Sequence, residues 1–186
     1  MNILQRLEQL QQSSAHPLVV AIDGGSGAGK STLAAYIAAH LEGVDVISTE
    51  EFLAPLSEQT SQPGTEFDWR RLKEQVLLPL AKKKSIHYWR YDRQEPTMQQ
   101  WIHVEPRRIV LIEGSYSSRL ELASYYDVKI WIDTPEHIRL TRMVKKDGEH
   151  MRGYWQHYLP KETAHMASYL PQRYAEMIID GMNKIE

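Results

Sequence analysis

The sequence has no cysteine and no apolar run long enough to cross a membrane. Without cysteine the chain can form neither disulfides nor thiolate metal sites, which is compatible with a reducing cytoplasm. The longest apolar run, around residues 18–22, falls far short of the roughly 20 residues that a membrane-spanning helix needs. Residues 1–16 also lack the continuous apolar core of a signal peptide. We therefore expect a cytoplasmic protein without a membrane partner.

The chain also lacks a large excess of charge of either sign. It has 22 lysines and arginines against 24 aspartates and glutamates, interspersed, for a formal net charge of −2. A nucleic-acid-binding domain usually presents a basic face, so we expect no nucleic-acid partner. The length of 186 residues fits a single domain, residues 1–186, with a sizeable core. The oligomeric state stays open, and a homo-oligomer is compatible with the sequence.

Glycine, by contrast, is concentrated directly after the first apolar run. Residues 21–32 read AIDGGSGAGKST and match the phosphate-loop pattern GxxxxGK followed by Ser or Thr. Glycine allows close approaches that a Cβ would forbid, so successive backbone N–H groups can converge on phosphate oxygens. The lysine of the pattern reaches the terminal phosphates, and the hydroxyl can ligate Mg²⁺. We predict that the phosphates of ATP bind to Gly24, Gly25, Ser26, Gly27, Ala28, Gly29, Lys30, Ser31 and Thr32.

Short apolar stretches alternate with helical patterns through the rest of the chain. We expect strands at residues 18–22, 44–48, 109–112, 128–132 and 177–179, and helices at 1–12, 33–41, 72–80 and from 134 onward. Residues 54–67 are expected to form a loop, and residues 86–101 follow no clean period. All-apolar strands separated by helices indicate a mainly parallel sheet with helices on both faces. The predicted fold class is therefore α/β, a three-layer P-loop NTPase that binds ligands at the carboxyl ends of its strands.

Acidic residues close two of the later strands. Glu113 ends the strand at 109–112, where P-loop enzymes place the second acid that organises magnesium. We therefore predict a Mg²⁺ site at Ser31 and Glu113, partly through water. Asp133 ends the next strand, but Thr134-Pro135 follows it at a helix start, and this favours a capping or turn role for Asp133.

A phosphoryl-transfer enzyme also needs a base and positive charge near the transferred group. Glu50 and Glu51 follow the second strand and supply the base; because adjacent carboxylates repel, one is expected to face the phosphate loop and the other solvent. The helix from residue 134 carries basic residues three and four positions apart, hence on one face: Arg139, Arg142 and Lys146. Such a face can be a solvated surface. Together with the phosphate loop it predicts a small basic lid at about residues 139–153, in which Arg139 and Arg142 act on the phosphoryl group.

Other classes of P-loop protein are less compatible with the sequence. No glycine has an aspartate three residues before it, so the Asp-x-x-Gly motif of GTPases is missing. The terminal Asn183-Lys184-Ile185-Glu186 matches the guanine-reading motif imperfectly and is interpreted as a coincidence. A small-molecule kinase is the favoured hypothesis. The alternative is a nucleotide-binding regulator or ATPase that keeps the phosphate loop without the kinase chemistry.

Several motifs in order resemble the uridine kinase and phosphoribulokinase family of P-loop kinases. They are Gly24 to Thr32, Ile47 to Leu53, Phe67-Asp68-Trp69, Tyr88-Trp89-Arg90-Tyr91-Asp92, Val110 to Gly114, Asp133 to Asp147 and Ala175 to Asp180. The resemblance implies a kinase that uses ATP and Mg²⁺ to phosphorylate a hydroxyl of a nucleoside or another sugar-like small molecule. It implies that Glu50 is the general base, that Asp68, Tyr91 and Glu113 serve the substrate side, and that Lys30 acts with Arg142 and Arg139 on the phosphoryl group.

The chain departs from this family on the acceptor side. Glu50 stands where the family has aspartate, Leu53 lacks a tyrosine hydroxyl, and Met143 and Lys146 replace two lid arginines. Residues 93–96 also lack the histidine and arginine of pyrimidine nucleoside kinases. Because the phosphate loop is intact, these differences predict unchanged ATP binding and an altered acceptor pocket.

Two groups of large side chains, most of them aromatic, receive different interpretations. One group lies in a non-periodic, charged segment and can form a wall of the acceptor pocket or pack elsewhere: Tyr88, Trp89, Tyr91 and Trp101. The other group has spacings typical of helix packing and is predicted to be core: Trp155, Tyr158, Met166 and Tyr169.

Overall fold

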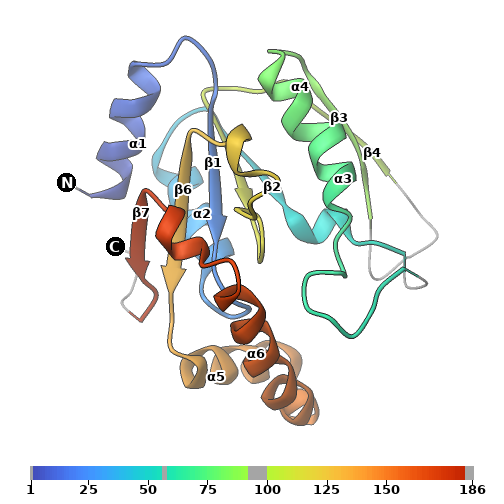
Figure 1. Cartoon of the computed structure of the whole chain (residues 1–186). Helices are drawn as coiled ribbons and strands as arrows, with labels where there is room; N and C mark the ends of the chain where they lie inside the picture. The colour runs from blue at the N-terminus through green and yellow to red at the C-terminus, as the bar shows by residue number, and fades with distance from the viewer. Residues whose placement is uncertain (1, 56–57, 92–99, 183–186) are drawn as a thin grey trace.

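The computed structural model of the protein describes residues 2–55, 58–91 and 100–182. At its centre is a five-stranded parallel sheet with the strand order β2-β5-β1-β6-β7 (Figure 1). The strands are β1 (Leu18–Asp23), β2 (Val44–Ser48), β5 (Ile109–Glu113), β6 (Val128–Asp133) and β7 (Met177–Asp180). The parallel sheet and its interleaved helices confirm the predicted α/β class.

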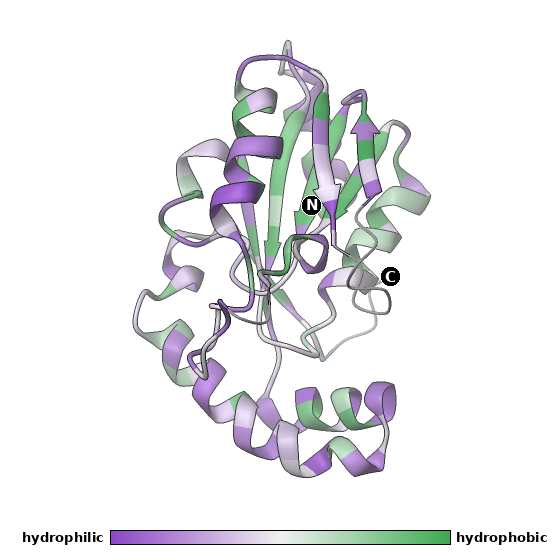
Figure 2. Cartoon of the chain, turned by 90° about the vertical axis from the view of Figure 1, so that its right-hand side faces the viewer, coloured by the Kyte–Doolittle hydropathy of each residue, from purple (hydrophilic) through white to green (hydrophobic). Residues whose placement is uncertain are grey.

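Every residue of β1 and β5 is buried, because helices cover both faces of the sheet. Successive side chains of a strand point to opposite faces. Val20 and Ile22 accordingly pack on one side, with the first two helices, α1 (Ile3–Gln12) and α2 (Lys30–His40). Val19 and Ala21 pack on the other side, beneath the helical segment at residues 69–81. The sheet is therefore the middle layer of three, and Figure 2 shows its strands as the hydrophobic centre of the molecule.

The helical segment on the second face is not one regular helix. It consists of α3 (Trp69–Leu72), a π-helical turn η2 (Lys73–Leu77) and α4 (Leu78–Ala81). Short 3₁₀ turns complete the connections: η1 (Thr49–Phe52), η3 (Ala123–Tyr125) and η5 (Pro171–Tyr174). These elements cover the sheet and leave the carboxyl ends of the strands open toward the cavity described below.

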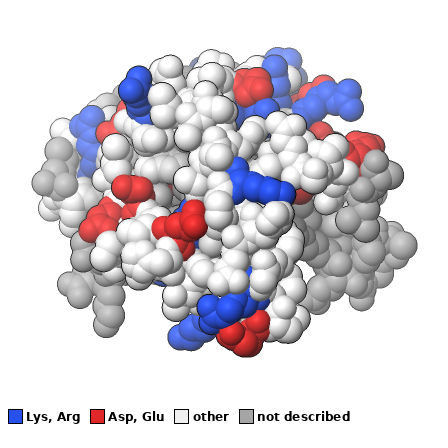
Figure 3. All heavy atoms as spheres, turned by 60° about the horizontal axis from the view of Figure 1, so that its bottom comes forward, with Lys and Arg blue, Asp and Glu red and all other residues white. Residues whose placement is uncertain are grey.

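Helices α5 (Glu136–Asp147) and α6 (Arg152–Ala167), joined by the turn η4 (Glu149–Met151), project beyond the carboxyl ends of the strands (Figure 1). They contain residues 139–153, the predicted lid. On this side of the molecule, lysine and arginine side chains are interspersed with aspartate and glutamate (Figure 3). Within the described ranges, no helix has the length and apolar character needed to cross a membrane.

A two-stranded antiparallel hairpin is the main element that the periodicity did not predict. It pairs β3 (Ile86–Arg90) with β4 (Gln100–Val104). On β3, Ile86 and Tyr88 point into the core, whereas β4 is half-buried or exposed along its length. The apolar alternation is therefore clear on only one strand, and aromatic and charged residues on the exposed side obscure it.

The start of α5 also differs from the expectation. The helix begins at Glu136, with Pro135 at the capping position, rather than at Thr134-Pro135. The Thr134 hydroxyl instead donates a hydrogen bond to the Ala28 carbonyl in the phosphate loop, at 3.0 Å. Thr134 thus connects the end of β6 to the loop after β1.

Candidate active site

The loop of residues 24–29 connects β1 to α2 by a path that requires glycine. Gly27 has φ +77° and Gly29 has φ +111°, both in the region that side chains disfavour. A Cβ on Gly27 would also lie 2.8 Å from the Arg139 carbonyl oxygen. The loop ends at the N-terminus of α2, where unpaired N–H groups and the helix dipole suit an anion.

Asp23 fixes the start of this loop. Its fully buried carboxylate accepts hydrogen bonds from the Gly24 N–H at 2.7 Å and the Tyr116 N–H at 2.9 Å. It also accepts from the Ser118 N–H at 3.0 Å and the Ser118 hydroxyl at 2.7 Å. Burial raises the pKa of Asp23, and the hydrogen bonds from Ser118 and Gly24 oppose that rise. Through these contacts Asp23 ties the start of the loop to the segment after β5.

Lys30 and Ser31, the first residues of α2, lie next to the end of β5, where the predicted acid Glu113 is found. The Lys30 Nζ donates to the Gly24 and Gly25 carbonyls, each at 3.0 Å, and to the Ser115 hydroxyl at 3.1 Å. The Ser31 hydroxyl donates to the Glu113 carboxylate at 3.1 Å. Burial lowers the pKa of Lys30, and nearby carboxylates raise it in opposition. The structure therefore brings together the two residues predicted to organise magnesium.

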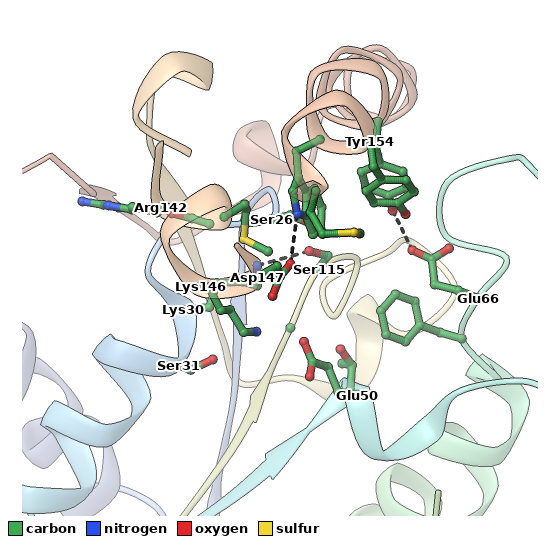
Figure 4. Close-up of a pocket in the computed structure, with 18 of the residues that line it drawn as sticks. Ser26, Lys30, Ser31, Glu50, Glu66, Ser115, Arg142, Lys146, Asp147 and Tyr154 are labelled. Atoms are coloured by element: carbon green, nitrogen blue, oxygen red, sulfur yellow. Dashed lines mark hydrogen bonds between the residues drawn. The ribbon is translucent and has the colours of Figure 1, made fainter. Parts of the chain in front are cut away.

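A cavity of about 1150 Å³ opens beside the phosphate loop (Figure 4). Its walls come from five places: the phosphate loop with the start of α2, the end of β2 with η1, the loop at residues 59–67, residues 113–115 at the end of β5, and the helices α5 and α6 with the turn between them. In Figure 4 Lys30 and Glu50 point into the same space, and Glu66 and Tyr154 lie further along the wall. The cavity thus has a phosphate end and a second end lined by side chains.

The two adjacent glutamates after β2 have different surroundings. Glu50 is exposed and lines the cavity. Glu51 accepts a hydrogen bond from the Tyr88 hydroxyl at 2.6 Å and lies 4.0 Å from the Arg90 Nε. Glu51 therefore contacts the β3-β4 hairpin and keeps only 19% of its side chain exposed, whereas the sequence predicted that one of the two faces solvent. Of the pair, Glu50 is the one that lines the cavity.

The second end of the cavity is formed by residues that the sequence did not single out as functional. The Tyr158 hydroxyl donates to Glu66 at 2.7 Å, and the same carboxylate accepts from the Gly64 N–H at 2.6 Å. The rings of Tyr154 and Tyr158 are stacked with their centroids 5.6 Å apart. The Trp155 Nε1 donates to Asp147 at 2.9 Å.

The prediction that Trp155 and Tyr158 belong to the core is therefore wrong, because both line the cavity. Met166, from the same predicted group, is buried in the structure as expected. The apolar residues of α6 do not gather on one helical face. That absence of an apolar stripe was the signal that this helix does not pack as an ordinary core helix.

Two residues predicted to contact the acceptor are not placed at the cavity. The Asp68 carboxylate caps α3, accepting from the Arg71 N–H at 3.0 Å, and it also pairs with the Arg71 side chain. The Tyr91 N–H donates to the Glu51 carbonyl at 2.9 Å. Neither residue lines the cavity among the described parts of the chain. Asp92, residues 93–96 and the terminal 183–186 lie outside the described residues.

The aromatic residues of the hairpin do not line this cavity either. Tyr88 is buried and stacks on Phe52 with ring centroids 5.0 Å apart. Trp89 and Trp101 contact each other across the hairpin, 4.4 Å between centroids. These contacts favour the packing interpretation over the acceptor-wall interpretation for the three tryptophan and tyrosine side chains.

The basic residues of α5 point in different directions. Arg142 lines the cavity and donates to the Gly27, Ala28 and Gly181 carbonyls, and its side chain points away from Glu50 (Figure 4). Lys146 also lines the cavity. Arg139 is buried behind the phosphate loop and is not among the lining residues. The helical spacing therefore did not place Arg139 with the other two.

Comparison with known proteins gives a consistent result. A family model described as the phosphoribulokinase / uridine kinase family matches residues 19–170. A uridine kinase of Alkaliphilus metalliredigens is 30% identical over 181 residues, covering 88% of this chain and 86% of that protein. A uridine kinase of Limosilactobacillus reuteri is 27% identical over 198 residues, covering 94% of this chain and 88% of that protein.

Solved structures show the same fold at lower identity. A Bacillus stearothermophilus protein described as a possible uridine kinase has a TM-score of 0.70 at 19% identity, covering 97% of this chain and all of that chain. A D-glycerate 3-kinase from Cryptococcus neoformans has a TM-score of 0.58 at 18% identity, covering 85% of this chain and 84% of that chain. These similarities confirm the P-loop kinase fold.

Proposed function

The chain belongs to the phosphoribulokinase and uridine kinase family and is a phosphotransferase with a hydroxyl acceptor. On that premise we propose that it transfers the γ-phosphoryl group of ATP to a nucleoside or another sugar-like small molecule. The observation that carries the proposal is the placement of Lys30 and Glu50 at one cavity, which the phosphate loop borders on one side. A cation for the phosphates and a carboxylate for the acceptor hydroxyl are the two groups this reaction requires.

The donor end has the residues that Mg-ATP needs. The phosphate loop and Lys30 would hold the phosphates, and Ser31 with Glu113 would hold the magnesium ion. Mg²⁺ prefers oxygen ligands and retains several waters, so a hydroxyl and a carboxylate 3.1 Å apart fit it. Elsewhere in the described chain, no group of three or more His, Asp or Glu side chains is arranged to hold a metal alone. When bound, the ion would neutralise phosphate charge.

A few side chains would share the steps of the phosphoryl transfer. Glu50 would accept the proton of the acceptor hydroxyl, because it is the carboxylate of its pair that lines the cavity. Lys30 would exchange its hydrogen bonds to the Gly24 and Gly25 carbonyls for phosphate oxygens. Arg142 and Lys146, at the cavity rim, add positive charge. Most of the rate enhancement would come from positioning and charge stabilisation.

The second end of the cavity favours an acceptor with several hydroxyls. It combines the Tyr154 and Tyr158 rings with the Glu66 carboxylate and the polar loop of residues 59–62. Aromatic faces beside a small number of polar groups are typical of sites for small ringed molecules. This composition supports a sugar-like acceptor. It does not identify the nucleobase or other substituent that the sugar carries.

The proposal is tested by measuring ADP release with a panel of nucleosides, sugars and polyols. A kinase releases ADP only when an accepted hydroxyl compound is present, and Lys30→Ala abolishes that release. A nucleotide-binding regulator instead binds ATP, shows no stimulation by any acceptor, and keeps its residual hydrolysis in Glu50→Gln.

A further inference from the structure

The proposed function does not use one fully buried charged residue beside the phosphate loop, Glu162 of α6. Both of its carboxylate oxygens accept from the Ser26 N–H, at 3.0 and 2.9 Å, and one also accepts from the Ser26 hydroxyl at 2.7 Å. The Arg139 guanidinium pairs with it at 2.8 Å. A carboxylate of the protein thus binds directly to the main chain of the phosphate loop.

Ser26 lies at the middle of that loop. Its neighbour Gly25 provides one of the carbonyls that bind the Lys30 Nζ. Backbone N–H groups in such loops are ligands for phosphate oxygens, and the lysine reaches the terminal phosphates. The Glu162 carboxylate therefore occupies an anion-binding N–H of the same loop whose carbonyls bind the Lys30 Nζ.

The charges around Lys30 also indicate that the Glu162 carboxylate lies close to the Lys30 ammonium group. Burial lowers the pKa of Lys30, and the carboxylates of Glu162, Glu113, Asp23 and Glu50 oppose that lowering, with Glu162 first among them. The Arg139 guanidinium is held by Glu162, by Thr163 at 2.7 Å and by the Ser26 carbonyl, and its charge offsets part of the Glu162 charge. A further negative charge at the Lys30 end of the loop would face the Glu162 carboxylate.

We propose that Glu162 is a specificity-determining residue for the nucleotide: its carboxylate competes with the terminal phosphate of ATP for the Ser26 N–H and for the field of Lys30. The inference rests on the proposed function, because it takes ATP as the phosphoryl donor. Glu162 penalises a nucleoside triphosphate more than a diphosphate, since only the triphosphate brings charge to its position. Because Glu162 belongs to α6, the seating of that helix against the loop is sensitive to the terminal phosphate.

The test measures dissociation constants for ATP and for ADP by calorimetry, with Mg²⁺ and without any acceptor. The isosteric variant Glu162→Gln removes the charge and keeps a hydrogen-bond acceptor for Ser26 and Arg139. We expect its ratio of ATP to ADP affinity to rise about tenfold, on the order of the effect of one like charge at a partly shielded site. The control Glu149→Gln removes an exposed lid carboxylate that pairs with Arg152, and its ratio should equal that of the wild type.

A second variant covers the case in which Arg139, left without its buried partner charge, prevents Glu162→Gln from folding. Ser26→Ala keeps every charge and removes only the hydroxyl that holds Glu162. Its affinity ratio should rise about twofold, because one hydrogen bond to the competing carboxylate is lost.

An unchanged or lowered ratio in the variants that fold would overturn the assignment of Glu162 alone, since the wild type would still bind ATP. Absence of ATP binding by the wild type would overturn the proposed function together with this inference. A merely structural role for Glu162 predicts that the affinities for ATP and ADP change by the same factor.

Discussion

The two ends of the cavity are built from different parts of the protein. The phosphate end consists of main chain and buried side chains at the ends of β1 and β5; Asp23 is fully buried, and Lys30 and Glu113 are less than one tenth exposed. The other end consists of half-buried or exposed side chains from the loop at 59–67 and from α6, such as Glu66 and Tyr154. The first depends on backbone geometry that the sheet fixes. The second can change by substitution without disturbing the sheet, so one phosphate end can serve different acceptors.

The largest effect should follow from loss of the cation at the phosphate end. Lys30→Ala removes the buried ammonium group that would stabilise the transferring charge, so we expect kcat/KM to fall by at least about a hundredfold. Steady-state kinetics with a coupled ADP assay measure this. Lys145→Ala, on the exposed side of α5, is the matched control and should leave the rate unchanged.

Glu50 lies between the two ends, and its removal should affect chemistry alone. Glu50→Gln should lower kcat by about a hundredfold, the ordinary contribution of a general base, with little change in the KM for ATP. Glu51→Gln, next in the chain, weakens the hydrogen bond from Tyr88 and should keep its kcat. Equal losses of kcat in both variants would contradict the assignment of the base to Glu50.

A substitution at the second end of the cavity should change the KM for the acceptor. Tyr158→Phe removes the hydroxyl that orients Glu66, so we expect the KM for the acceptor to rise about tenfold while the KM for ATP stays constant. Tyr174→Phe, an exposed tyrosine away from the cavity, serves as the control. If the KM for ATP rises as much as that for the acceptor, the two ends are not separate in function.

The smallest effect concerns Asp68, which the family resemblance assigned to the acceptor. Asp68→Ala removes the cap of α3 and should destabilise the fold by about 1 kcal/mol, lowering the Tm by about 2–4 °C. Thermal unfolding measures the shift, and kinetics should show unchanged acceptor KM. A clear rise in that KM would restore Asp68 to the acceptor site.

The sequence predicted that Ser31 and Glu113 meet beside the phosphate loop, because this arrangement depends on local spacing and on the ends of the strands. The glycine pattern, Lys30 and Ser31 are consecutive, and Glu113 is identified by its place at the end of an apolar strand. In each case the parallel sheet converts a position along the chain into a position at one edge.

The other end could not be predicted in the same way, because it is formed by contacts between distant segments. Glu66 meets Tyr158, 92 positions later in the chain, and no local pattern marks either residue. The motif instead pointed to Asp68, two residues further on, whose side chain caps a helix. Arg139 shared the helical spacing of Arg142, but the buried carboxylate of Glu162 draws it behind the loop.

The central claim is that the two ends act on two substrates in one transfer. Mass spectrometry of the acceptor after incubation with Mg-ATP tests this most directly. We predict that one sugar-like compound of the panel gains a single phosphoryl group, in equal amount to the ADP formed, and that Glu50→Gln suppresses the product. ATP binding with no phosphorylated product from any hydroxyl compound would contradict the account.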